Sequence, residues 1–310
     1  MKAVRFHEYG GSEVLRYEDA PMPEPGGGEL LIEVHAAGVN PADTQFRRGD
    51  YRAYAPLALP AIVGWDVAGT VARTGSGAAR FKRGDAVFAL ADMSRQGAYA
   101  QYIAVAEAHV AFAPRSVPLE HAAGVPLAAL TAWTALFDAG QLQRGQTVLV
   151  HAGAGGVGLF AIQLARRAGA HVAATASSVN HALLRKLGAD TVIDYRRDDF
   201  AAQLRNIDAV LDTVGGDTRA RSWPVLRQGG MLVAIAMPPP DPAVAERHGV
   251  RSAMVAVAPD GKRLAEIGAL IASGELEVVI DSEFPLAQAA DAHRRIEQGH
   301  ARGKIVLRVG

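Results

Sequence analysis

A glycine-rich run at positions 153–158, Gly-Ala-Gly-Gly-Val-Gly, is the feature of the chain that points most directly to a chemistry. It matches the pattern G-x-G-x-x-G, directly after an apolar segment at 147–150 and at the start of a helical pattern. Glycine lets the backbone approach a pyrophosphate, and a helix start offers it free N–H groups and positive potential. The run predicts dinucleotide binding through Gly153, Ala154, Gly155, Gly156, Val157 and Gly158. The alternative is a turn whose glycines only permit close packing.

The residues after the next strand pattern predict which dinucleotide binds. An NAD site usually carries Asp or Glu about 20 residues after the first glycine, where the carboxylate accepts from the ribose 2′-hydroxyl. Here that neighbourhood, 175–178, reads Thr-Ala-Ser-Ser, and no acidic residue occurs between Gly153 and Asp190. A carboxylate would repel a 2′-phosphate, whereas hydroxyls can bind one. The sequence therefore favours NADP(H), and the alternative is an exposed serine loop without preference.

Residues for metal-centred or nucleophilic chemistry are missing. The chain has no cysteine, which excludes thiolate nucleophiles and metal sites that need thiolates. Its ten histidines include no pair at short ligand spacing. There is no H-E-x-x-H, no Walker A sequence, and no nucleophile elbow around Ser76. We expect no metal site and neither hydrolase nor ATPase activity.

Two different patterns of predicted secondary structure would position these residues, one before and one after about residue 121. In the first 120 residues, segment 30–36 alternates between apolar and polar positions, and further short strands are predicted at 67–72, 86–90 and 99–105. From about 121, strands alternate with helices, which predicts a parallel sheet covered on both faces. Helical character is predicted at 121–139, strands at 147–150, 171–175, 191–194, 208–212 and 230–235, and helices at 180–187, 198–205 and 217–227. The tail adds a helix at 259–273, a strand near 276–280, a helix at 286–298 and a strand at 304–309.

Length and charge limit the partners. A chain of 310 residues suits two domains better than one. Lys+Arg and Asp+Glu both number 32, so the balanced charge gives no footprint for nucleic acid or an anionic membrane. The start of the chain does not resemble a signal peptide, and the uncharged stretches at 121–137 and 145–165 fit a core better than a membrane span. We expect a cytoplasmic protein that binds neither nucleic acid nor membrane.

Motifs from one end of the chain to the other resemble the zinc-free quinone oxidoreductase (zeta-crystallin-like) branch of the medium-chain dehydrogenase/reductase superfamily. They include AAGVNPAD at 36–43, GWDVAGTV at 64–71, PLAALTAWTAL at 126–136, VLVHAGAGGVG at 148–158, LGADTVIDY at 187–195 and GKIVL at 303–307. The resemblance implies an α/β protein with a GroES-like β-rich catalytic domain at 1–120, completed by about 276–310. A Rossmann-type doubly wound parallel-sheet domain at 121–275 would bind NADP(H), with the active site in the cleft between the domains.

Site residues follow from the resemblance by position. It places Asn40, Asp43 and Tyr51 at the nicotinamide and substrate end, and Thr131 against the cofactor. The positions that match 2′-phosphate contacts are Ser177, Ser178, Asn180 and Tyr195, where Asn180 replaces a lysine of some relatives. Gln45 stands where some relatives carry a second tyrosine. Zinc-dependent relatives carry a ligand at the position of Asn40 and a His-Glu pair at Trp65–Asp66; this chain lacks both, which implies no catalytic zinc.

Each of the three residues at the substrate end has a simpler interpretation. Asn40 precedes Pro41 and could serve only as the N-cap of a helix. Asp43 could pair with Arg47, four residues later on the same helical face. Tyr51 could be a surface aromatic in a loop. These alternatives stay open at the level of sequence.

The predicted activity is zinc-independent hydride transfer from NADPH to a quinone or an α,β-unsaturated carbonyl compound. The Asn40 amide, or a water it holds, would stabilise the oxygen that gains charge, and water or Tyr51 would return a proton. One alternative is an enoyl reductase for a larger thioester or lipid-derived substrate; another is an NADPH-binding structural or sensor protein without turnover. The apolar segment 250–257 is suited to pair edge strands in a homodimer, or to lie inside under the helix that follows.

Overall fold

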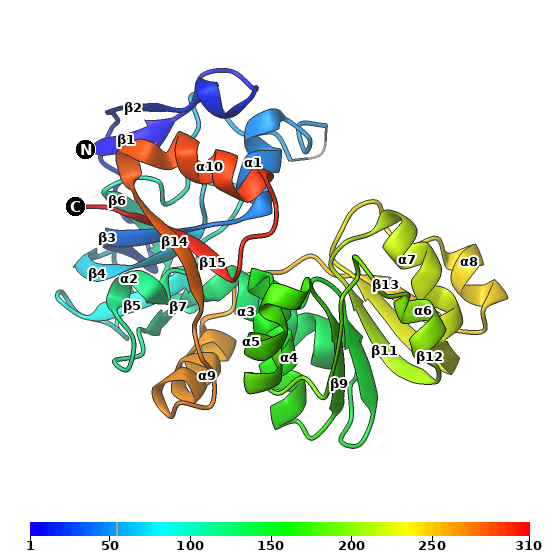
Figure 1. The fold of residues 1–310 in the computed structure, drawn as a ribbon. Coiled ribbons are helices and arrows are strands. Elements are labelled where there is room, and N and C mark those ends of the chain that lie inside the picture. Colours follow the sequence, from blue (N-terminus) through cyan, green and yellow to red (C-terminus); the bar gives the residue numbers. More distant parts are fainter. Residues whose placement is uncertain (54) are drawn as a thin grey trace. The chain divides into compact units, whose positions relative to one another are not determined.

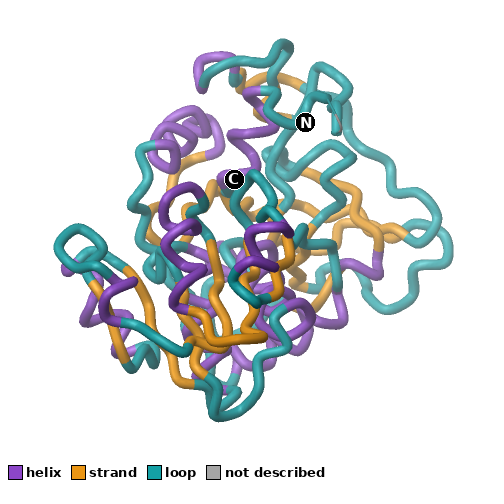
Figure 2. The backbone as a smooth tube through the Cα atoms, turned by 90° about the vertical axis from the view of Figure 1, so that its right-hand side faces the viewer, coloured by secondary structure: helices purple, strands orange, loops and turns teal. Residues whose placement is uncertain are grey.

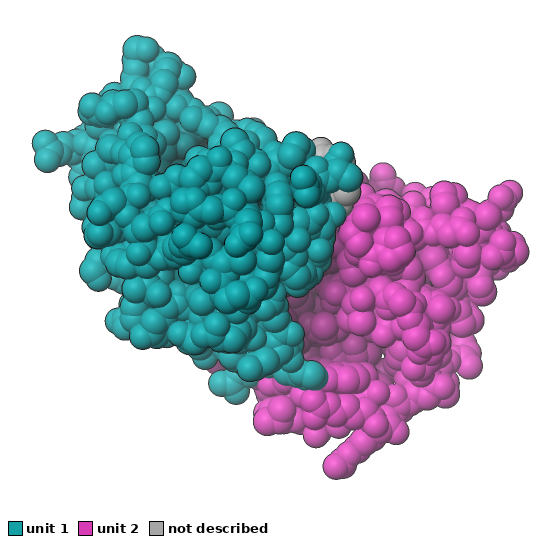
Figure 3. All heavy atoms as spheres, turned by 90° about the horizontal axis from the view of Figure 1, so that it is seen from above, with its two compact units in different colours: residues 1–130, 258–274, 278–310 teal, residues 131–257, 275–277 magenta. Residues whose placement is uncertain are grey.

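The computed structural model describes residues 1–53 and 55–310, which divide into two compact units (Figure 3). Unit 1 consists of residues 1–130, 258–274 and 278–310, and unit 2 of residues 131–257 and 275–277. These bounds differ from the predicted domains because they assign 121–130 and 258–274 to unit 1. The functional domains themselves, 1–120 with 276–310 and 121–275, stay a prediction.

The described part of unit 1 is built on a seven-stranded sheet in the order β14-β15-β3-β4-β5-β7, with β6 also paired to β3. β15 pairs antiparallel with β3, so the last strand of the chain completes a sheet begun near its start (Figure 1). A separate two-stranded sheet joins β1 and β2. The bounds are β1 Lys2–Arg5, β2 Arg16–Asp19, β3 Glu29–Val39, β4 Asp66–Thr74, β5 Ala86–Leu90, β6 Tyr102–Ala106, β7 Val110–Phe112, β14 Ile280–Pro285 and β15 Lys304–Arg308.

The alternation predicted for 30–36 is present in β3 from residue 32 to residue 36, whereas residues 30 and 31 are both buried. Ile32, Val34 and Ala36 are buried, whereas Glu33 is exposed and His35 half-buried. Alternation of this kind puts one face of the strand in the core. Beyond residue 36 every residue through Val39 is buried. Asn40, which follows directly, therefore also lies in the interior.

Helices of unit 1 begin at recognisable caps. α1 (Pro41–Arg48) has proline at its first position, where the missing N–H costs nothing, and ends at Gly49 with a φ of 86°. α9 (Gly261–Ala272) begins at Asp260, whose side chain accepts from the Arg263 N–H. The other helices are α2 (Leu119–Ala122), α10 (Ala289–Glu297) and most of α3 (Pro126–Trp133).

Unit 2 contains a six-stranded parallel sheet in the order β10-β9-β8-β11-β12-β13. This is the doubly wound order, and its direction reverses between β8 and β11, where such sheets bind ligands at the carboxyl ends of their strands. Helices alternate with the strands along the chain. Figure 2 shows helices in purple beside strands in orange. The bounds are β8 Thr147–Val150, α4 Gly156–Arg167, β9 His171–Thr175, α5 His181–Lys186, β10 Thr191–Ile193, α6 Phe200–Gln203, β11 Ile207–Asp212, α7 Gly216–Ser222, β12 Leu226–Ala234, α8 Pro242–Arg247 and β13 Arg251–Met254.

The predicted alternation of strands and helices is confirmed, but several predicted elements were wrong in extent. The helical stretch 121–139 is broken at Pro126, which cannot continue a helix and starts α3 instead, and it ends in a π-helical turn at Thr134–Ala139. The helix predicted to reach 227 ends at Ser222, because Leu226 already belongs to β12. The strand predicted near 276–280 lies at Ile280–Pro285, where pairing with β15 outweighs the more apolar local sequence.

None of the described helices combines the length with the apolar composition that crossing a bilayer requires.

Candidate functional site

The glycine run of unit 2 forms the turn between β8 and α4. Gly153 N–H donates to the Thr175 carbonyl at 2.8 Å, and Gly155 N–H donates to the Ala152 carbonyl at 2.9 Å. Gly155 is the N-cap of α4, and no described side chain caps this helix. The first N–H groups of an α-helix have no partner inside the helix. Those of α4 are therefore available to an anionic ligand.

The glycines of the turn serve different purposes. A Cβ on Gly158 would lie 2.5 Å from the Ala152 carbonyl oxygen, and one on Gly153 would lie 2.9 Å from Leu184 Cδ2. Close packing alone therefore explains why glycine stands at positions 153 and 158, in agreement with the alternative that the glycines only permit close packing. At Gly155 the nearest atom, the Ala152 oxygen, is 3.3 Å away, and φ is −77°, which any residue adopts. Apart from this oxygen, no described protein atom lies within 4 Å of a Cβ at Gly155, which fits a bound phosphate on the other side.

His151, which directly precedes the turn, is held by hydrogen bonds at both of its ring nitrogens. The sequence analysis did not identify this residue. Its Nε2 lies 2.9 Å from Ser222 Oγ, and its Nδ1 lies 3.1 Å from Thr175 Oγ1. Because Ser222 donates its hydroxyl to the Thr218 carbonyl, it must accept from His151, so the proton of the neutral ring is on Nε2. Burial lowers the pKa of His151 to about 4, and the ring stays neutral.

Four residues predicted to contact a 2′-phosphate gather beyond the end of β9. Ser177 and Asn180 are joined by a hydrogen bond of 3.3 Å from Asn180 Nδ2 to Ser177 Oγ. Ser178 lies in the same short 3-10 helix as Asn180, and Tyr195 lies on the loop after β10. Arg196, which the sequence analysis missed, places its guanidinium 5.7 Å from the Tyr195 ring centre. Arg196 can therefore supply the positive charge that Asn180, in place of lysine, does not.

Thr131, near the end of α3, carries a polar atom in need of a partner. The residue is 5% exposed, and its Oγ1 has no hydrogen-bond partner among the described residues. Buried hydroxyls in folded proteins nearly always have a partner, so an orphaned one suggests a missing ligand or water. The predicted cofactor contact at Thr131 fits this observation.

In unit 1, Asn40 lies in a buried cluster with Asp66 and Lys304. Asn40 Nδ2 donates to Asp66 Oδ2 at 2.9 Å, and Asn40 Oδ1 accepts from the Lys304 ammonium. Lys304 also lies 3.2 Å from Asp66 Oδ2, and Asp66 Oδ1 accepts from the Leu127 N–H at 2.6 Å. Asn40 is the N-cap of α1 by position, but its side chain turns to this cluster, so capping is not its only role.

Asp43 lies against the same cluster and is fully buried. Its Oδ2 accepts from the Asn40 backbone N–H at 2.7 Å and from the Tyr99 hydroxyl at 3.0 Å, whereas Oδ1 has no partner among the described residues. Burial raises the pKa of Asp43 to about 7, against the lowering effects of the Asn40 N–H and the Lys304 charge. Asp43 can therefore exchange a proton near neutral pH.

A chain of hydrogen bonds leads from Asp43 toward the surface. Arg47 Nη1 lies 3.0 Å from His293 Nδ1, and His293 Nε2 lies 3.1 Å from the Tyr99 hydroxyl. Because a guanidinium only donates, His293 accepts at Nδ1 and donates from Nε2, which leaves the Tyr99 proton for Asp43. Burial lowers the pKa of His293 to about 3, so the ring is neutral. The expected ion pair between Asp43 and Arg47 was wrong: Arg47 pairs with Glu297 instead.

Tyr51 lies just beyond α1 and is held there. Its hydroxyl donates to Gln45 Oε1 at 2.7 Å, and its ring packs on Phe46 with 4.8 Å between centroids. Phe46 in turn packs on Trp65, also at 4.8 Å. Tyr51 is therefore half-buried and not a free surface aromatic. Its partner Gln45 stands at the position where some relatives carry a tyrosine.

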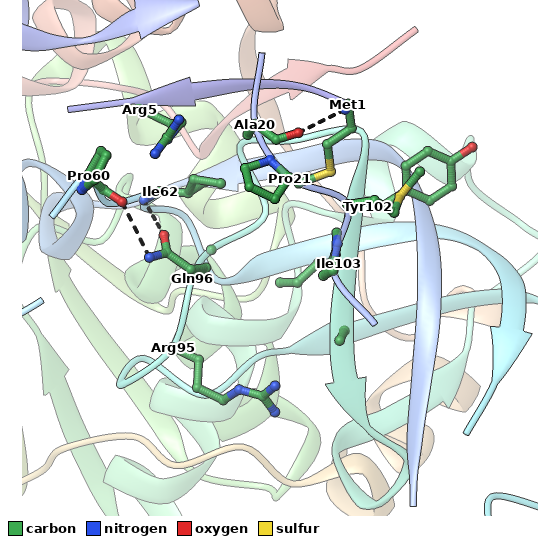
Figure 4. Close-up of a pocket in the computed structure, with 14 residues that line it drawn as sticks. Met1, Arg5, Ala20, Pro21, Pro60, Ile62, Arg95, Gln96, Tyr102 and Ile103 are labelled. Carbon is green, nitrogen blue, oxygen red and sulfur yellow. Dashed lines mark hydrogen bonds between the residues drawn. The ribbon is translucent and has the colours of Figure 1, made fainter. Parts of the chain in front are cut away.

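A cavity of about 340 Å³ in unit 1 contains none of the predicted site residues (Figure 4). Its two arginines already have carboxylate partners: Arg5 pairs with Glu18 at 3.2 Å, and Arg95 pairs with Glu29. The cavity therefore offers little free charge to an anionic ligand. No group of three or more potential metal ligands occurs among the residues that the structure describes.

Comparison with known proteins identifies relatives over the whole chain. Residues 26–115 match the alcohol dehydrogenase GroES-like domain, which confirms the predicted fold of the first domain, and residues 187–307 match a zinc-binding dehydrogenase model. A chloroplastic NADPH-dependent alkenal/one oxidoreductase of Arabidopsis thaliana is 37% identical over 99% of this chain and 79% of its own.

Solved structures show the same relationship. A quinone oxidoreductase from Coxiella burnetii superposes with a TM-score of 0.92 at 35% identity, covering 100% of this chain and 99% of that one. An Escherichia coli quinone oxidoreductase in complex with NADPH superposes with a TM-score of 0.89 at 29% identity, covering 99% of this chain and 100% of the other.

Proposed function

Because the chain belongs to the quinone oxidoreductase branch of the medium-chain dehydrogenase/reductase superfamily, we propose that it transfers hydride from NADPH to quinones or α,β-unsaturated carbonyl compounds. The observation that carries the proposal is the start of α4 at Gly155, which no described side chain caps, in a doubly wound sheet. Relatives named for alkenals, enones and quinones favour these acceptors over a larger enoyl thioester and over a sensor without turnover.

The coenzyme would be held by residues of unit 2, Thr131 among them. The first N–H groups of α4 and the Gly155 backbone would bind the pyrophosphate, and the Thr131 hydroxyl would gain the partner it lacks. The 2′-phosphate would meet Ser177, Ser178, Asn180 and Tyr195, with Arg196 beside them. When bound, NADPH supplies a hydride to the acceptor.

On the acceptor side, Asn40 would act on the oxygen that gains negative charge. When hydride adds to the β-carbon of an enone, the electrons of the double bond move onto the carbonyl oxygen. An amide N–H placed beforehand at that oxygen stabilises the charge as it develops. The cation that Asn40 and Asp66 contact is the Lys304 ammonium, and we propose that the reaction proceeds without zinc.

The enolate or hydroquinone anion must then gain a proton. Tyr51 can donate one if its bond to Gln45 is exchanged, and Asp43 can exchange a proton near neutral pH. Replacing Tyr51 with phenylalanine is expected to lower kcat at least tenfold on enones, because general acids commonly contribute at least about a hundredfold. The effect on quinones should be smaller, since an oxygen anion takes a proton from water readily. Steady-state rates with 2-alkenals, enones and quinones measure this difference.

Tyr17, an exposed residue, provides the control variant Tyr17→Phe. If Tyr51→Phe matches the wild type on every acceptor, Tyr51 has no part in proton transfer.

NADPH oxidation tests the proposed function directly. The purified protein should oxidise NADPH faster than NADH with quinones or enones, and should turn over larger enoyl thioesters more slowly. Tight NADPH binding without turnover on any acceptor would support the sensor alternative. Preferred turnover of a thioester would support the enoyl reductase alternative.

We also propose a homodimer in the cytoplasm. β13, within the predicted segment 250–257, is the last strand in the order of its sheet, and its residues Ser252–Met254 are only half-buried. A strand edge of this kind can pair with its counterpart in a second copy. Light scattering should give about twice the mass of the 32.5 kDa chain, and a monomer would contradict the proposal.

A further inference from the structure

Lys304 is a buried lysine whose three ammonium donors all have acceptors. Its Nζ lies 3.2 Å from the Val39 carbonyl, 3.2 Å from Asp66 Oδ2, and within hydrogen-bond distance of Asn40 Oδ1. The residue is only 5% exposed. Burying a charged pair costs desolvation energy that the mutual attraction often fails to repay, and apolar residues of similar volume often serve stability as well. Stability alone is therefore a poor reason for a lysine here.

The ammonium determines which way the Asn40 amide faces. An ammonium only donates and a carboxylate only accepts, so the atom of Asn40 next to Lys304 is Oδ1 and the atom next to Asp66 is Nδ2. Both neighbours select the same orientation. The bond to Asp66 uses one of the two Nδ2 hydrogens, and the described residues give the second no acceptor. The Asn40 amide therefore has one N–H without an acceptor among the described residues, and its oxygen is already bonded to Lys304.

We propose that Lys304 is a positioning residue for hydride transfer, because its ammonium holds the Asn40 amide in the orientation that leaves only an N–H for the acceptor oxygen. This inference rests on the proposed function. Without the ammonium, only Asp66 still favours this orientation. An amide that turns over more often presents its oxygen, which would repel the negative charge developing on the acceptor. A hydrogen-bond donor of this kind commonly contributes about a hundredfold or more to kcat.

The charge of Lys304 has a second, measurable consequence in the protein without coenzyme. The groups that face Asp43 are the Asn40 N–H, the Tyr99 hydroxyl, Lys304 and Asp66. Of these, Lys304 lowers the pKa of Asp43 and Asp66 raises it. Removal of the ammonium should therefore raise the pKa of Asp43 above its present value of about 7.

Two substitutions separate the charge from the space it fills. Lys304→Gln keeps a polar side chain that can bond to Asp66, but it can also accept a hydrogen bond, so only Asp66 still favours the present orientation of Asn40. Lys304→Arg keeps a group that only donates. We expect Lys304→Gln to lower kcat at least tenfold on enones and quinones, with KM for NADPH changed less than threefold, and Lys304→Arg to recover most of the loss. Lys82→Met, at an exposed lysine, is the control.

The test combines kinetics with NMR of coenzyme-free protein. Carboxyl signals from ¹³C-labelled aspartate should show a higher pKa for Asp43 in Lys304→Gln, and the Asn40 side-chain amide signals should shift and broaden as two orientations interconvert. In an Asn40→Ser background, the effect of Lys304→Gln on kcat should largely vanish, because no amide remains to be oriented.

An equal loss of kcat with and without the Asn40→Ser substitution would overturn the inference, as would unchanged kcat in Lys304→Gln. Urea unfolding shows whether each variant is folded. If Lys304→Gln does not fold, Lys304→Arg decides: a folded Lys304→Arg that loses as much kcat as Asn40→Ser overturns the inference. If the wild type turns over no acceptor, the proposed function fails first, and the NMR signals alone decide whether Lys304 orients Asn40.

Discussion

Replacing Gly155 with alanine is expected to weaken NADPH binding at least tenfold while changing the free energy of unfolding little. The new Cβ would meet only the Ala152 oxygen, which at 3.3 Å must shift by a few tenths of an ångström, and the backbone already has a φ of −77°. It would, however, fill the space in which the backbone meets the pyrophosphate. A tenfold loss corresponds to about 1.4 kcal/mol, which displacement of one phosphate contact readily exceeds. Fluorescence titration with NADPH and urea unfolding measure the two quantities.

Gly158→Ala is the matched comparison within the same turn. Its Cβ would lie 2.5 Å from the Ala152 oxygen and 2.8 Å from Gly153 Cα, so backbone atoms must move. Overpacking of this kind typically costs about 1–3 kcal/mol of stability. The two variants should therefore show different defects: Gly155→Ala has a lower affinity for NADPH, and Gly158→Ala has a lower free energy of unfolding. Unchanged NADPH affinity in a folded Gly155→Ala would show that the turn does not hold the pyrophosphate.

The second large effect concerns Asp43 and pH. The pKa of Asp43 is raised from 3.8 to about 7, so between these values the folded protein binds a proton that the unfolded chain has released. Stability therefore falls as pH rises, and the penalty is complete above the folded pKa. The full shift corresponds to about 4 kcal/mol. Asp43→Asn keeps an acceptor for Asn40 and Tyr99 but does not titrate, so its stability relative to the wild type should rise between pH 5 and pH 8.

Urea unfolding of both proteins across this range measures the difference. His151 and His293 have lowered pKa values, so their contribution to stability is lost as pH falls below about 6.5, the opposite direction. Both histidines remain in Asp43→Asn, so their effects cancel in the comparison. Asp198→Asn, at an exposed residue, controls for the change of net charge. A constant difference between wild type and Asp43→Asn at all pH values would mean that Asp43 does not titrate in this range.

The local sequence predicted the strand, the glycine turn and the helix at 147–168 well, for a physical reason. A strand, a glycine turn and a helix that are contiguous in sequence are also contiguous in space, so the residue types at 147–168 suffice to predict them. The alternation in β3 was equally readable, because burial of one strand face imposes a period of two. The strand at Ile280–Pro285 was not, since its pairing with β15 lies outside its own sequence.

By itself the sequence predicted the kind of chemistry: a backbone site for a dinucleotide, and an asparagine at position 40 in a chain without cysteine. Only the tertiary structure decided how that asparagine is held. Lys304 is 264 residues from Asn40 in the chain, and His293 is 194 residues from Tyr99, so no local pattern relates them. Burial then decided their charges, because removal of water raises the pKa of Asp43 and keeps both histidines neutral. The sequence gives the residue types, but the hydrogen-bond partners of these side chains and the removal of water around them arise only when the chain folds.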